Sequence, residues 1–132
     1  LTHFAHHHSW TPDGQGILFN DRIVTAEEKS ETRMFLVDFD GTNRRVVFDA
    51  PIGSHPVMHP TGTAILDSDS EGIYLVRPDE KRVDRVAAFS KGFDRTHHGT
   101  HPHPVWRQDG SVILYNSAES GHSEIYYITM EG

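Results

Sequence analysis

The sequence has 132 residues, which is typical of one domain, and it contains no cysteine, so disulfide frameworks and thiolate metal sites are excluded. A formal net charge of −7 and the lack of a long apolar run argue against a nucleic-acid partner, a membrane surface and a transmembrane span. No secretory leader is visible, which favours a cytoplasmic location over a periplasmic one.

The first predicted unit covers about residues 5–49. An extended segment that contains His7 ends at a turn over residues 12–14, and an apolar strand is predicted for residues 16–19. Two more strands are predicted, for residues 34–39 and for residues ending at Phe48. This unit therefore has four short strands, and no helical periodicity of comparable length competes with them.

The same pattern returns twice, in units that cover about residues 53–90 and 99–132. Each begins with a histidine-proline segment and continues through a glycine turn into apolar strands. In the second unit the last strand ends at Phe89, whereas the third unit stops after its third strand. The third unit is therefore predicted to lack its outermost strand.

The repeat has a fixed register. Forty-eight residues separate Gly14 from Gly62, and 48 separate Gly62 from Gly110. Four antiparallel strands in about 40 to 50 residues are typical of a β-propeller blade. The sequence therefore predicts an all-β protein with about three blades of four antiparallel strands, the last one incomplete. Three blades cannot close a ring, so the remaining blades would come from a longer chain or an assembly.

Histidines recur at one position of the repeat, because the same register superimposes His7, His55 and His103. The innermost strand of each propeller blade lines the central channel, so these three side chains are expected to meet at one mouth of it. Since side chains alternate along a strand, His7 rather than its neighbours His6 and His8 is expected to face the channel.

An insertion before the third unit adds His97, His98 and His101 to the cluster. Proline follows His101 and His103, which predicts an extended backbone with both imidazoles on one side. Imidazole without thiolate suits Mn, Fe, Ni or Zn, so a metal site is predicted. The alternative is a group of exposed histidines that bind nothing. His122 is expected to be merely solvated.

Three segments, "HHSWTPDG", "SHPVMHPTG" and "THPHPVWRQDG", resemble the oligogalacturonate lyases, which are seven-bladed propellers with TolB-like repeats. Most of the chain resembles the C-terminal third of such an enzyme. The resemblance implies a manganese ion held by three histidines and a fourth ligand, which is glutamine in the family. The corresponding positions are His55, His101, His103 and, in place of the glutamine, His98.

The resemblance also implies a substrate contact at His7, next to an acidic position that His8 or Ser9 replaces here. The arginine that the family uses as a base lies upstream of this sequence. No catalytic residue is therefore assigned, and the chain alone is expected to be inactive. Arg95 and Arg107 are candidates for an assisting role at the channel mouth.

The function implied by the resemblance is β-elimination on an oligogalacturonate, with a uronic-acid oligosaccharide as the partner. A divalent cation would neutralise the substrate carboxylate while a base removes the adjacent C5 proton. Two alternatives remain open. One is a non-catalytic TolB-like propeller that binds a protein, and the other is a lyase or hydrolase that acts on another uronic polysaccharide.

Overall fold

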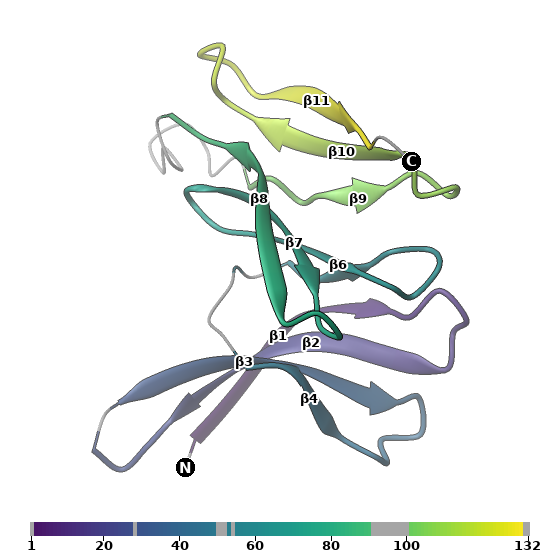
Figure 1. Ribbon diagram of the computed structural model, residues 1–132. Helices are drawn as coiled ribbons and strands as arrows, with labels where there is room; N and C mark the ends of the chain where they lie inside the picture. The colour runs from purple at the N-terminus through teal and green to yellow at the C-terminus, as the bar shows by residue number, and fades with distance from the viewer. Residues whose placement is uncertain (1, 28, 50–52, 54, 91–100, 131–132) are drawn as a thin grey trace.

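The structure is a computed structural model that describes residues 2–27, 29–49, 53, 55–90 and 101–130. In these residues the regular structure consists of β-strands, without a helix, and the strands form three antiparallel sheets that follow one another along the chain (Figure 1). No helix in the described part of the chain is long and apolar enough to span a membrane. Arg95, His97 and His98 lie outside the described residues.

The first sheet contains β1 (Thr2–Trp10), β2 (Gly16–Val24), β3 (Ser30–Asp38) and β4 (Arg45–Phe48) in that order. Its strands β2 and β3 extend well beyond the predicted apolar segments. The reason is cross-strand pairing of polar residues, including the oppositely charged pair Asp21 and Arg33, which continues the ladder where hydrophobic alternation stops.

The second sheet contains β5 (Val57–Met58), β6 (Ile65–Ser68), β7 (Gly72–Arg77) and β8 (Arg82–Ala88). The third contains β9 (Val105–Trp106), β10 (Val112–Ser117) and β11 (Glu124–Thr129), in the order β11-β10-β9. Sheets of four, four and three strands confirm the predicted fold class, and the third sheet has three strands within the described residues.

Two apolar layers hold neighbouring sheets together. Leu18 and Met34 pack against Ile65 between the first and second sheets. Leu66 packs with Ile113 between the second and third. The repeat explains this arrangement, because equivalent residues on the second strand of each blade point toward the blade that follows.

The third sheet has no such cover on its far side. Leu18 and Leu66 are 0% exposed, whereas the equivalent Leu114 is 42% exposed. Leu114 pairs with Tyr127, and Ile125 lies two residues away on the same side of β11. Ile125 and Tyr127 are 75% and 70% exposed, so this apolar sheet face is open.

Candidate metal centre

The three repeated histidines converge where β5 and β9 begin and at the equivalent point within β1, which we call the histidine end of the inner strands. His7 lies in β1, while His55 and His103 each lie two residues before the inner strand of their sheet, β5 or β9. The ring centroids of His7 and His55 are 4.2 Å apart, and those of His55 and His103 are 4.3 Å apart. The repeat register therefore predicts correctly that these side chains meet.

Three of the four predicted ligands form a compact group. His55, His101 and His103 each offer one ring nitrogen, and these atoms all lie within 4.8 Å of one another. The ring of His101 is centred 5.6 Å from both other rings. Three convergent imidazoles are a donor set that suits a divalent transition ion, so the side chains present fit such an ion. The predicted fourth ligand, His98, lies outside the described residues.

The backbone that brings His101 and His103 together differs from the predicted extended segment. His103 has a φ of 41°, in the left-handed region, although Pro104 follows it. A non-glycine residue there is conformationally costly, so surrounding contacts must hold it. Pro102 and Pro104 are buried, whereas His101 and His103 are exposed, so the prolines fix the segment to the rest of the protein. The two imidazoles are therefore neighbours because the chain turns at His103.

Strict alternation also fails at His7. Between His6 and Ser9 the pairing of β1 with β2 shifts by one residue, and His7 has a φ of 50°. Such a bulge changes the direction of side chains locally. The ring of His6 lies 4.8 Å from that of His7. The expectation that His7 alone of the three consecutive histidines faces the cluster stays a prediction.

His55 is the most enclosed member of the cluster. Its side chain and backbone are 8% exposed, and its amide donates a hydrogen bond of 2.8 Å to Oδ1 of Asp67. Burial, reinforced by the nearby His7 and His103, lowers the pKa of His55 to about 4. His55 is therefore neutral at physiological pH, as a metal ligand must be.

Asp67 and Asn116 are the residues that sequence reasoning missed. Burial raises the pKa of Asp67 to about 7, even though three hydrogen bonds favour its ionised form. Asn116 anchors the other ligand segment. Its backbone N–H donates to the carbonyl of Pro102 at 2.8 Å, and its side-chain Nδ2 donates to the carbonyl of His101 at 3.3 Å. A carboxylate inside the apolar strand "AILDS" is the signal that points to Asp67.

A hollow of about 230 Å³ opens beside the cluster, and its lining includes His7, His55, His103 and the prolines that follow the latter two. Ser9 also lines it, but its hydroxyl donates a hydrogen bond of 2.7 Å to the carbonyl of Pro56. This bond joins the inner segments of two blades. His8 also lines the hollow, so both candidates for the acidic position lie there, and of the two Ser9 has a structural contact.

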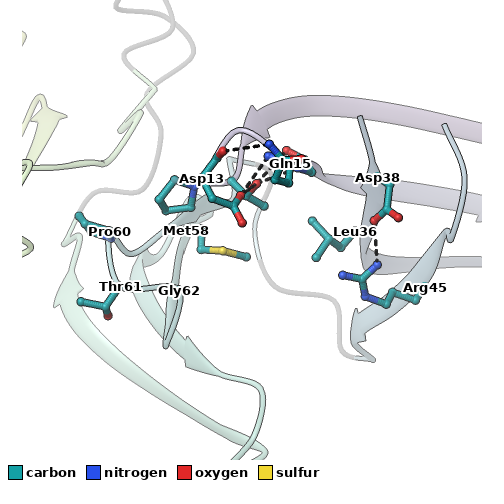
Figure 2. Close-up of a pocket in the computed structure, with 12 residues that line it drawn as sticks. Asp13, Gln15, Leu36, Asp38, Arg45, Met58, Pro60, Thr61 and Gly62 are labelled. Carbon is teal, nitrogen blue, oxygen red and sulfur yellow. Dashed lines mark hydrogen bonds and ion pairs between the residues drawn. The ribbon is translucent and has the colours of Figure 1, made fainter. Parts of the chain in front are cut away.

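A larger hollow of about 540 Å³ lies at the opposite end of the inner strands, where the turns are (Figure 2). Its lining combines Met58 and Leu36 with the ion pair between Arg45 and Asp38, whose Nη1 and Oδ1 atoms are 3.4 Å apart. Among the described residues, no histidine lines it. The larger hollow is thus separate from the candidate metal centre.

The remaining candidates lie away from the cluster. Arg107 follows β9, at the turn end of the inner segment, and its Nε is 3.3 Å from Oδ2 of Asp109. It is therefore at the wrong end to assist at the histidine mouth. His122 is exposed between β10 and β11, which agrees with a merely solvated side chain.

Comparison with solved structures identifies proteins of the same fold. An oligogalacturonate lyase in complex with manganese superimposes with a TM-score of 0.76 at 23% sequence identity, over 98% of this chain and 36% of the lyase. The oligogalacturonate lyase of Vibrio parahaemolyticus gives 0.74 at 19% identity, over 95% of this chain and 35% of the lyase. TolB from Acinetobacter baumannii gives 0.70 at 21% identity, over 98% of this chain and 30% of TolB.

These likenesses confirm the expected resemblance at the level of fold. The chain spans about a third of the length of the propeller proteins that it matches. No protein-family model matches the sequence, and no curated protein sequence matches it significantly.

Proposed function

We propose that this chain is the metal-bearing part of a propeller lyase that cleaves uronic-acid oligosaccharides, with oligogalacturonate as the preferred substrate class. The observation that carries the proposal is the group of His55, His101 and His103 at one end of the inner strands. Its support is the fold shared with two oligogalacturonate lyases, one of them in complex with manganese.

The proposed metal is a divalent transition ion, with manganese preferred, and the proposed ligands are His55, His101, His103 and His98. When bound, such an ion supplies Lewis-acid stabilisation of the negative charge that develops next to a uronate carboxylate. A local positive centre also accounts for how a chain with a net charge of −7 would accept an anionic sugar.

The residues of the chain itself would bind and orient the substrate. His55 is buried, which holds its side chain in place, and its lowered pKa keeps the ring neutral, so a proton does not occupy the nitrogen that would bind the metal. His7 lies at the edge of the 230 Å³ hollow, and partial burial together with His6 lowers its pKa. A neutral imidazole at this position offers one N–H to a sugar oxygen, which is the substrate-binding role proposed for His7.

The proton-abstracting base is not assigned to this chain, and the chain alone is proposed to lack lyase activity. The open face of the third sheet supports the need for further blades, because Leu114, Ile125 and Tyr127 would be covered by a sheet packed as the first two are. A complete propeller would add both the cover and the missing base.

A second candidate function is a non-catalytic protein-binding propeller, which the likeness to TolB favours. Calorimetric titration with trigalacturonate, with and without Mn²⁺, separates the two. The lyase proposal expects binding that requires Mn²⁺, weakens in His7→Ala and disappears in His55→Ala. If the wild-type chain binds no trigalacturonate, either with or without Mn²⁺, the lyase proposal is contradicted. Parallel titrations with other uronate trisaccharides test the alternative substrate class.

A further inference from the structure

Asp67 is a buried carboxylate in β6, and both of its side-chain oxygens accept hydrogen bonds from the protein. Its residue is 0% exposed. Oδ1 accepts from the amides of His55 and Ser68, each at 2.8 Å, and Oδ2 accepts from Nδ2 of Asn20 at 3.2 Å. Burying a carboxylate is costly unless specific donors compensate, so this arrangement calls for a reason beyond packing.

The repeat shows that the fold itself does not need a carboxylate here. The equivalent residue is Phe19 in the first sheet and Tyr115 in the third. An aromatic side chain therefore satisfies this position in the two other blades. The second sheet differs in that its buried side chain at this position holds the backbone of a histidine in the cluster.

The contact between Asp67 and the segment before β5 is close. Gly53 has a φ of 54°, and a Cβ atom on it would lie 2.5 Å from Oδ1 of Asp67 and 2.3 Å from the carbonyl oxygen of Ser68. Asn20 reaches the same segment, because its Nδ2 is 3.4 Å from the carbonyl oxygen of Gly53. Glycine is required at position 53 for the backbone to approach so closely.

We propose that Asp67 and Asn20 are positioning residues that fix His55 for metal binding. Asp67 acts through the backbone amide of His55, and Asn20 acts through Asp67 and the carbonyl of Gly53. Neither belongs to the group of ligand side chains, and the inference rests on the proposed function in that it assumes a metal centre. Asn116, the repeat equivalent of Asn20, also donates from Nδ2 to a carbonyl of a ligand segment, that of His101, and its backbone amide donates to the carbonyl of Pro102. Side chains of the second strands thus anchor both ligand-bearing segments.

The chemistry of Asp67 predicts a graded response to substitution. Asp67→Ala removes the acceptor and leaves the buried amide of His55 without it. Asp67→Asn keeps one oxygen for that amide but turns a second donor toward Nδ2 of Asn20. Outer-shell partners of metal ligands are worth about 10- to 100-fold in affinity, so Asp67→Ala should weaken metal binding by that factor and Asp67→Asn by less.

The experiment combines two measurements on the 132-residue chain. Calorimetric titration with Mn²⁺ compares wild type, Asp67→Ala, Asp67→Asn and the control Leu66→Ala, at a temperature where circular dichroism shows each variant folded. Leu66 is adjacent and equally buried but packs on the other face of the sheet, so its loss destabilises the fold without touching His55. We expect affinity within about twofold of wild type for the control, against the larger losses above.

Amide hydrogen exchange on the metal-free chain supplies the second measurement. The His55 amide should be protected in wild type, and its protection relative to the amides of β7 should fall in Asp67→Ala but not in Leu66→Ala. Wild type that binds no Mn²⁺ but shows this exchange pattern removes the proposed function and leaves the positioning of His55 intact. Equal Mn²⁺ affinity in wild type and Asp67→Ala, or unchanged exchange at His55, overturns the inference while the proposed function stands.

Discussion

The two ends of the inner strands differ in how strictly they repeat. At the turn end, the amides of Gly14, Gly62 and Gly110 each donate to the carbonyl three residues earlier, at 2.9, 2.8 and 2.8 Å. Their φ angles are 69°, 78° and 75°. At the histidine end, the equivalent residues His7 and His103 share a left-handed φ, of 50° and 41°, but the contacts that support each ligand segment differ from blade to blade.

The first blade has a bulge at His7, the second anchors His55 on Asp67, and the third turns at His103 with Asn116 behind it. The turn end repeats because a left-handed glycine turn is a backbone requirement common to all blades. The histidine end varies because a single cluster needs a different contribution from each blade. The repeat therefore places the histidines of the cluster, and departure from it marks a residue that supports them, such as Asp67.

The largest predicted effect is a loss of stability on substitution of one of the three equivalent turn glycines. Gly110→Ala should destabilise the chain by about 2 to 3 kcal/mol, because it forces alanine into a left-handed turn and displaces the ring of His59 from Trp106. A Cβ at position 110 would lie 2.2 Å from Nε2 of His59. Urea denaturation measures the change.

Gly14→Ala is the matched control, since a Cβ there meets nothing within 4 Å. It should cost only the backbone strain, about 1 to 2 kcal/mol. Equal losses of stability in the two variants would contradict the prediction, because they would show that moving the ring of His59 costs no free energy.

The next largest predicted effect is a loss of Mn²⁺ affinity when a supporting side chain at the histidine end is removed. Asn116→Ala removes the side-chain anchor of His101 and should weaken Mn²⁺ binding by about 10- to 100-fold. Asn43→Ala, which removes an exposed side chain that bonds to Asp38 at 2.7 Å, is the control and should leave affinity unchanged. Equal Mn²⁺ affinities in the two variants, read by competition with a fluorescent chelator, would count against anchoring by Asn116.

The smallest effect is the net pH dependence of stability in the metal-free wild-type chain, because the pKa shifts of His55 and Asp67 oppose each other. The pKa of His55 is lowered from 6.5 to about 4, so the unfolded chain binds the extra proton in that window and stability from His55 falls as pH drops. The pKa of Asp67 is raised from 3.8 to about 7, so the native state holds the extra proton and stability from Asp67 falls as pH rises. The two contributions oppose each other.

Replacing either residue should therefore tilt the profile in opposite directions. Relative to wild type, His55→Ala should lose stability as pH rises from about 4 to 6.5, and Asp67→Asn should gain stability as pH rises from about 4 to 7. Thermal unfolding in chelator-containing buffers measures both profiles. Parallel profiles for all three proteins would contradict the opposed shifts.

The sequence predicts the three sheets and the meeting of His7, His55 and His103, because a 48-residue register places equivalent residues at equivalent sites. It does not predict the left-handed φ of His103, since local sterics before Pro104 favour an extended backbone and tertiary contacts override them. The full lengths of β2 and β3 are missed because polar pairs, rather than apolar alternation, continue them.

Asp67 could have been found from the sequence, since it is the single carboxylate at a position where Phe19 and Tyr115 stand in the other repeats. What the sequence cannot supply is its partner, because the hydrogen bond from His55 depends on how the preceding segment folds over β6. Repeat comparison identifies unusual residues, and only the assembled sheets show what they contact.

The central claim, a metal centre at the histidine end alone, is tested most directly by counting bound Mn²⁺ per chain with electron paramagnetic resonance of the free ion. Wild type and His59→Ala, which alters a histidine at the turn end, should each bind one ion. The double variant His55→Ala with His101→Ala should bind none. Stoichiometric binding by the double variant at wild-type affinity, or no binding by wild type, would contradict the account.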